Sequence, residues 1–127
     1  MGSVAKTPRI LCGVSLYTLA APGTPGDPGD LIAPTLVGAF DGWVDAGSAA
    51  TAALAELVAD APAVATFDAD ALFDYRARRP TLQIVDGRLA ELTWPELAVR
   101  RVTIGEHDLL VLSGAEPDDR WQAFSVA

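Results

Sequence analysis

Five residues of one short turn could hold a small ligand: Asp41, Gly42, Trp43, Asp45 and Gly47. The turn follows an apolar run and precedes a helical pattern, and open α/β sheets bind ligands at turns of this kind. Backbone N–H groups at the start of the helix would suit an anion. Neither glycine-rich phosphate-binding motif is present, however, and the two carboxylates would repel phosphate unless a metal intervened. We favour the structural alternative, in which Asp45 caps the helix, the glycines serve the turn, and Trp43 packs or contacts a partner.

Three arginines next to Tyr75 form a second candidate group: Arg76, Arg78 and Arg79. Guanidinium groups bind carboxylates and phosphates through paired hydrogen bonds, so this group could clamp an anionic ligand. Ion pairs within the same fold are the favoured explanation. The carboxylates available for such pairs are Asp70, Asp74 and Glu116.

No nucleophile in the sequence has a positioned base beside it. Cys12 is the only cysteine, which excludes a disulfide framework and a cysteine metal site. His107 is the only histidine, and its turn-like neighbours predict a surface position. We therefore expect no catalytic set, no metal and no cofactor.

Charge argues against two classes of partner. The 127 residues carry a formal net charge of -8, from 17 acidic and 9 basic side chains. Nucleic acids and anionic membranes both bind basic surfaces, so neither is an expected partner. No apolar run is long enough to span a bilayer, and the run after Lys6 and Arg9 is too interrupted for a clear signal peptide. A cytoplasmic location is the expectation, and the many alanines and arginines favour a bacterial source.

One strand–turn–helix unit positions the first candidate group. Residues 36–40 form a nearly continuous apolar run, which predicts a strand covered on both faces. Asp41 and Gly42 end this strand with a turn. Asp45 then caps the following helix, which ends at Pro62. The apolar stripe of the helix consists of Ala50, Ala53, Leu54, Leu57, Val58 and Ala61.

The remaining pattern predicts further strands of an α/β fold. Residues 63–67 should form a second strand beside the first, reached through a right-handed β-α-β crossover. The turn at Asp86 and Gly87 predicts a hairpin between two later strands. The later strands span residues 81–85, 89–94, 97–104 and 109–112.

The sequence divides into a flexible N-terminal segment, residues 1–32, and the first part of a single α/β domain, residues 33–127. Residues 22–30 contain three prolines and three glycines, too many for regular structure. Glu116 opens a last helix, with Arg120 on its surface, and both are further candidate contact residues. Because that helix would be cut after two turns, the sequence reads as the front of a longer domain.

Four separated motifs together resemble the proteasome assembly chaperone 2 family of bacterial proteins. They are GAFDGWVDAGSAATAAL, DYRARRPTLQIVDG, TWPE and LLVLSGAEPDDRWQAF, at residues 38–54, 74–87, 93–96 and 109–124. The resemblance implies a three-layer α/β/α fold with a mixed sheet, related to purine nucleoside phosphorylases. It also implies a role in protein assembly, because eukaryotic relatives help to assemble proteasome α-rings. Family members are usually much longer, so the resemblance covers their N-terminal portion.

Two functional interpretations are compatible with these residues. The first is an assembly-chaperone-like protein that binds another protein and itself, and exposure of Trp43 and Trp94 near one surface would favour it. The second is an enzyme with a phosphorylase- or carboligase-like site for a small anionic or nucleotide substrate. A pocket joining Asp41 or Asp45 to residues 76–79, with perturbed carboxylates, would favour the enzyme. We rank the first ahead because no base or nucleophile has a positioned partner.

Overall fold

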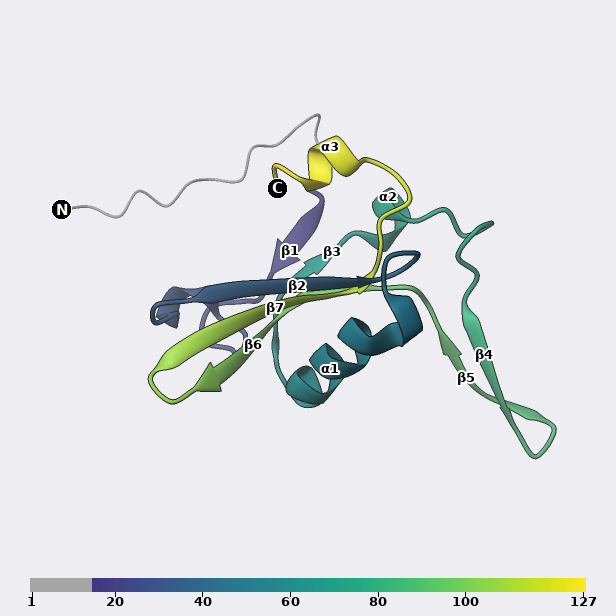
Figure 1. Cartoon of the computed structure of the whole chain (residues 1–127), viewed down its shortest axis with the longest axis horizontal. Helices are drawn as coiled ribbons and strands as arrows, with labels where there is room; N and C mark the ends of the chain where they lie inside the picture. The colour runs from purple at the N-terminus through teal and green to yellow at the C-terminus, as the bar shows by residue number, and fades with distance from the viewer. Residues whose placement is uncertain (1–14) are drawn as a thin grey trace.

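A computed structural model describes residues 15–127, and five strands form one mixed sheet (Figure 1). These strands are β1 (Tyr17–Leu19), β2 (Thr35–Asp41), β3 (Ala63–Phe67), β6 (Leu97–Ile104) and β7 (His107–Ala115). They lie in the order β1-β3-β6-β7-β2. Within this sheet β2 and β7 run parallel, and the other adjacent pairs are antiparallel. The mixed sheet that the resemblance implies is therefore confirmed.

Helices lie on both faces of the sheet (Figure 1). Helix α1 (Ala49–Val58) contacts β2, β6 and β7. Of its predicted apolar stripe only Leu54 is buried, whereas Ala50, Ala53 and Leu57 are exposed. Two shorter helices, α2 (Ala69–Leu72) and α3 (Trp121–Phe124), lie on the opposite face. Two single 3-10 turns, η1 (Pro28–Asp30) and η2 (Ala46–Ser48), precede β2 and α1 respectively. The layered α/β architecture agrees with the expected fold class.

The core on the face of α2 and α3 joins strands to short helices. Aromatic rings from three elements meet there: Phe124 of α3 lies with its ring centroid 6.0 Å from Phe40 and 5.2 Å from Phe67. These rings pack against a buried apolar centre, so the short helix α3 is held by side-chain contacts rather than by its own length. The buried centre consists of Leu16, Leu72, Phe73 and Leu97.

Strand β2 lies at the edge of the sheet, and the prediction that residues 36–40 are covered on both faces is wrong for residues 36–38, which are exposed. Among the described residues β2 pairs with β7 and with no other strand. Leu36 and Val37 are 62% and 40% exposed. An apolar run shows that a strand is suited to burial, but it does not specify which elements cover its faces or pair with its edges. Within residues 15–127, β7 pairs with one edge of β2 and no strand pairs with the other.

Strand β3 is not the neighbour of β2, so the predicted adjacent crossover is also wrong. The chain leaves β2, passes through α1 beneath β7 and β6, and returns as β3, which pairs with β1 and β6. The cause is the long β6–β7 hairpin, which inserts between them with a continuous register from Leu97 opposite Gly114 to Ile104 opposite His107. A hairpin of this length forms locally and fills the centre of the sheet.

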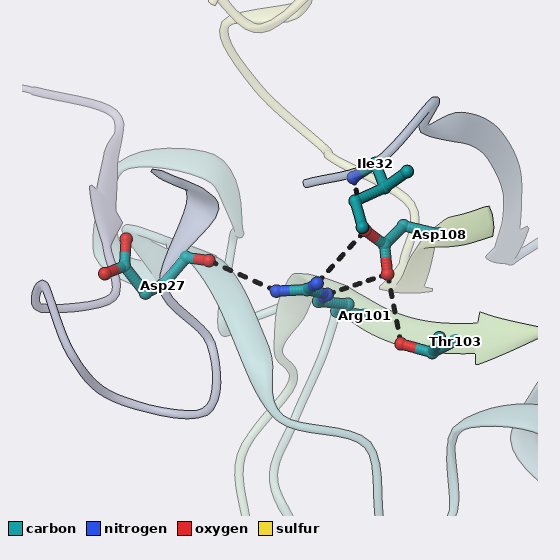
Figure 2. Close-up of polar contacts among 5 residues, drawn as sticks. All are labelled: Asp27, Ile32, Arg101, Thr103 and Asp108. Carbon is teal, nitrogen blue, oxygen red and sulfur yellow. Dashed lines mark hydrogen bonds and ion pairs between the residues drawn. The ribbon is translucent and has the colours of Figure 1, made fainter. Parts of the chain in front are cut away.

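A buried ion pair ties the segment before β2 to the sheet (Figure 2). The carboxylate of Asp108 accepts from Nε and Nη2 of Arg101, at 2.9 and 3.1 Å, and from the Thr103 hydroxyl at 3.0 Å. It also accepts the backbone N–H of Ile32 at 2.6 Å. Arg101 reaches further, donating to the carbonyl oxygen of Asp27 at 3.5 Å. The Ile32 bond, followed by the Arg101 pair, lowers the pKa of Asp108.

The expected flexible segment, residues 1–32, falls partly outside the described residues, which start at residue 15. Cys12 lies outside the described residues. Between residues 15 and 32 the structure contains β1, paired with β3, and the turn η1, where Asp27 accepts the N–H of Gly29 at 2.9 Å.

Strands β4 (Thr81–Val85) and β5 (Arg88–Thr93) form a separate antiparallel pair that projects from the main sheet (Figure 1). Asp86 and Gly87 join them with φ values of 51° and 73°, the two positive values of a type I′ turn. The predicted hairpin is confirmed. Every residue of both strands is exposed.

Candidate functional site

Asp45 fastens the turn after β2 to helix α1. Its carboxylate accepts the backbone N–H groups of Ala50 and Thr51, at 2.9 and 3.1 Å, and the hydroxyl of Thr51. These bonds, the hydroxyl bond first, lower the pKa of Asp45. Between Asp45 and the start of α1 at Ala49, Gly47 and Ser48 adopt φ values of 67° and 55°. The predicted capping contact is present, and Gly47 supplies backbone geometry that other residues adopt with strain.

Trp43 projects from this turn into solvent. Its side chain is 99% exposed and that of Val44 is 82% exposed. The turn itself is held by the Asp45 cap, so the indole is presented from a fixed base rather than from a loose loop. Exposed aromatic side chains are enriched where proteins contact partners.

A cavity of about 490 Å³ opens where the parallel strands β2 and β7 end. Asp41 lines it from the end of β2, and Gly114 lines it from the end of β7. Arg79 enters from the segment after α2, so the cavity joins the two groups of candidate residues. Its other polar or aromatic lining residues are Thr51, Arg78, Thr81, Thr93, Trp94 and Glu96.

The three clustered arginines have different surroundings. Arg76 is exposed and pairs with its neighbour Asp74, with Nε 3.1 Å from Oδ1. Arg78 donates from Nε to both carboxylate oxygens of Asp118, at 3.0 Å each. Arg79 has no ion-pair partner within residues 15–127 and lines the cavity. Arg76 and Arg78 therefore form ion pairs within the fold. Of the three arginines, Arg79 is the one whose side chain could still bind a ligand in the cavity.

Glu116 and Gly42 lie together beneath the turn. The backbone N–H of Glu116 donates to the carbonyl oxygen of Asp41 at 3.1 Å. A Cβ atom added at Gly42 would meet the end of the Glu116 side chain, which would have to move aside. Arg120, by contrast, is exposed and precedes α3 with a φ of 57°. The candidates outside the cavity lining are Gly42, Trp43, Asp45, Gly47, Arg76, Glu116 and Arg120.

Several cavity residues, Thr51 and Glu96 among them, were not singled out by sequence reasoning. Thr51 sits in the first turn of α1, where a hydroxyl can share the capping of a helix start. Glu96 belongs to the TWPE motif and pairs with Arg100 at 2.8 Å. The TWPE motif could have drawn attention to Glu96, but the sequence does not show that this segment lies near the end of β2.

The cavity offers charges of both signs and no assembled catalytic set. Arg79 supplies a cation, and Asp41 and Glu96 supply carboxylates. Such a site suits a ligand that carries both signs better than phosphate alone. Within residues 15–127 no three His, Cys, Asp or Glu side chains gather as they would around a metal ion. No helix in that part of the chain is long and apolar enough to cross a membrane.

Comparison with known proteins identifies the family. The profile of the PAC2 family matches residues 39–127. The chain belongs to the PAC2 family. No curated protein matches it.

Solved structures extend this PAC2 assignment. A Mycobacterium tuberculosis protein of unknown function is 36% identical, with a TM-score of 0.71 over 85% of this chain. A Corynebacterium glutamicum protein of unknown function is 34% identical, with a TM-score of 0.72 over 87% of this chain. A Mycobacterium tuberculosis proteasome-assembly chaperone homologue is 38% identical, with a TM-score of 0.61 over 70% of this chain. The chain covers only 39%, 42% and 39% of these three relatives.

Proposed function

We propose that this PAC2 chain is a protein-interaction domain of the assembly-chaperone type, which works in the bacterial cytoplasm by binding a protein partner and also binds itself. Its family membership supports this role, as does its similarity to a proteasome-assembly chaperone homologue. The observation that carries the proposal is the fully exposed Trp43 on the turn fastened by Asp45.

The proposal depends on the exposed position of the Trp43 indole. Tryptophan buries a large apolar area when it enters a partner's pocket, and it is among the residues that most often dominate binding energy. Because Asp45 and α1 already hold the turn, little conformational freedom would be lost on binding. Val44 beside it enlarges the apolar tip.

Purified proteasome α-subunits from an actinobacterium are the first partner to test, because one solved relative is a proteasome-assembly chaperone homologue. We expect the chain to bind them in a calorimetric titration, and Trp43→Ala to weaken binding about thirtyfold, which corresponds to a hot-spot residue. Ile104→Ala is the matched control, because Ile104 is an exposed apolar residue beside the turn of the β6–β7 hairpin. This control should bind like the unaltered chain.

Two results would contradict the proposal. One is the absence of binding to any assembly subunit together with turnover of a small substrate. The other is equal affinity for Trp43→Ala and the unaltered chain, which would remove the turn from the interface.

A second candidate function is an enzyme with a phosphorylase- or carboligase-like site for a small anionic or nucleotide substrate. The observation that favours it is that Arg79, without an ion-pair partner in residues 15–127, lines one cavity with Asp41. Titration with inorganic phosphate and with ATP, comparing the chain with Arg79→Gln, tests it. Binding that Arg79→Gln abolishes, accompanied by turnover, would establish the enzyme, and the assembly role predicts neither.

A further inference from the structure

The cavity at the ends of β2 and β7 lies where the connections from two neighbouring parallel strands diverge. The parallel register runs from Thr35 opposite Leu109 to Asp41 opposite Ala115. The chain leaves β2 into α1, on one face of the sheet, and leaves β7 toward α3, on the other face (Figure 1). Open α/β sheets bind ligands at such a point, because the diverging connections leave a crevice outside the strand ends.

Two side chains on this cavity carry opposite charges, and neither forms an ion pair in the described part of the chain. Asp41 lies at the end of β2, and Arg79 lies in the segment between α2 and β4. They do not pair with each other across the cavity. The other charged side chains of the lining, Arg78 and Glu96, each pair with a residue outside it. One positive and one negative group are therefore available to a ligand.

Glu116 makes the β2 side of the cavity more acidic. The end of its side chain lies against Gly42, the residue that follows Asp41. A phosphate that reached Arg79 would therefore also approach two carboxylates, which would repel it. A ligand with a positive group as well as a negative one would instead find a partner for each charge.

Trp94 gives the cavity an apolar surface with a fixed orientation. Its ring lies edge to face with Tyr75, with centroids 5.0 Å apart, and the Tyr75 hydroxyl donates to Asp70 at 2.7 Å. Half of the Trp94 side chain is still exposed, and Pro95 lines the cavity next to it. The volume of about 490 Å³ lies within the range of about 300–1,000 Å³ that is common for small-molecule sites.

We infer that this cavity binds a small zwitterion of the amino-acid type, with its carboxylate on Arg79, its ammonium group on Asp41 and its apolar side chain on Trp94. A guanidinium group binds a carboxylate through two parallel hydrogen bonds, and an ammonium group donates to a carboxylate. The inference goes beyond the proposed assembly role and does not depend on it. Its ligand class also differs from the anionic or nucleotide substrate of the second candidate function.

Titration of the full chain with L-phenylalanine, followed by NMR of the tryptophan indole N–H signals, tests the inference. The aromatic ring of this probe can pack edge to face on Trp94. We expect a saturable shift of the Trp94 signal, which Trp94→Phe identifies by its loss. The Trp43 signal should stay in place, because Trp43 lies outside the cavity lining.

Two analogues separate the charges of the ligand without altering the protein. The first, 3-phenylpropionate, lacks the ammonium group, and the second, phenethylamine, lacks the carboxylate. Each should bind at least about tenfold more weakly than L-phenylalanine, because each loses one charge-assisted contact. Affinity of either analogue equal to that of L-phenylalanine would overturn the inference.

Two variants assign each charge of the ligand to a side chain. Arg79→Gln should weaken L-phenylalanine at least about tenfold without weakening phenethylamine, which has no carboxylate to lose. Asp41→Asn should weaken L-phenylalanine to a similar extent without weakening 3-phenylpropionate. Arg76→Gln is the matched control, because Arg76 belongs to the same arginine cluster but lies outside the lining. Equal effects of Arg79→Gln and Arg76→Gln would contradict the assignment.

The outcomes separate this inference from both proposed functions. The absence of a saturable Trp94 shift overturns it and leaves the Trp43 interface intact, because Trp43 does not line the cavity. Inorganic phosphate or ATP that binds more tightly than L-phenylalanine, and is lost in Arg79→Gln, would overturn the zwitterion and favour the anionic substrate.

Discussion

Asp108 shows how one carboxylate can hold three parts of this fold together. It lies in β7, pairs with Arg101 of β6, and accepts the N–H of Ile32 before β2 (Figure 2). Because the carboxylate is buried and accepts from several donors, removing its charge would break the buried ion pair with Arg101.

Asp108→Asn should therefore lower the melting temperature clearly more than Asp74→Asn, whose Arg76 partner is exposed. Thermal unfolding followed by circular dichroism at neutral pH measures the difference. Equal melting temperatures for the two variants would show that the Asp108 cluster does not stabilise the fold.

The same carboxylate predicts a pH dependence. Its hydrogen bonds lower the pKa of Asp108 in the folded chain below the unfolded value of 3.8. Its contribution to stability is therefore complete above that unfolded value and is lost as the pH falls through the lower, folded value. Asp108→Asn should lose less stability than the unaltered chain when the pH falls below about 4. Parallel acid denaturation curves for the two proteins would contradict this assignment.

Gly114 lines the cavity, and its backbone geometry and surroundings require a glycine. Its φ is 135°, and an added Cβ would overlap the carbonyl oxygen of Glu96 in the neighbouring segment. Gly114→Ala should destabilise the fold by more than about 1 kcal/mol and distort the cavity. Gly38→Ala is the control, because its Cβ would make ordinary contacts, the nearest at 3.7 Å. Denaturant unfolding compares the two, and a neutral Gly114→Ala would show that the backbone there can relax.

At the scale of elements, local patterns gave the strands and helices but not their neighbours. The Asp86–Gly87 turn and the helical stripe act over a few residues, and both predicted elements are present. The pairing of β2 with β7 joins residues that lie more than seventy positions apart, and an apolar run carries no information about such a partner. This is why the local pattern predicts neither the exposure of residues 36–38 nor the separation of β3 from β2.

At the candidate site too, residue types could be predicted from local sequence, whereas long-range contacts could not. Asp41 and Arg79 could be named from residue type and local context, and the structure places both on one cavity. Which arginine remained without an ion pair could not be predicted. Arg78 is paired with Asp118, forty residues away, and that contact depends on how the segment before α3 folds back. Backbone N–H groups of Asp118 and Asp119 donating to Leu72 hold that segment in place.

Core packing gives a prediction at this scale. Leu97 of β6 is fully buried, whereas Leu57 of α1 is largely exposed. Leu97→Ala should cost about 2–5 kcal/mol of unfolding free energy, as large-to-small changes in a core do. Leu57→Ala should cost less than about 1 kcal/mol. Urea unfolding separates them, and similar costs would mean that the face containing Leu97 is not the centre of the fold.

At the scale of the whole molecule, exposed apolar surface gathers at three places: the edge strand β2, the tip at Trp43 and the β4–β5 hairpin. The apolar run at residues 36–40 predicts a strand covered on both faces. The strand lies at the edge, yet the PAC2 profile matches residues 39–127. Membership therefore depends on the order of motifs and elements rather than on the burial of β2.

The exposed tip permits a direct test of protein binding at that turn. In a variant with Trp94→Phe and Trp121→Phe, Trp43 is the only remaining tryptophan, so the fluorescence reports the turn alone. On titration with proteasome α-subunits modified to lack tryptophan, we predict that the emission moves to shorter wavelength and saturates as the indole leaves water. Unchanged emission in a mixture where sedimentation shows the complex has formed would contradict the proposed interface.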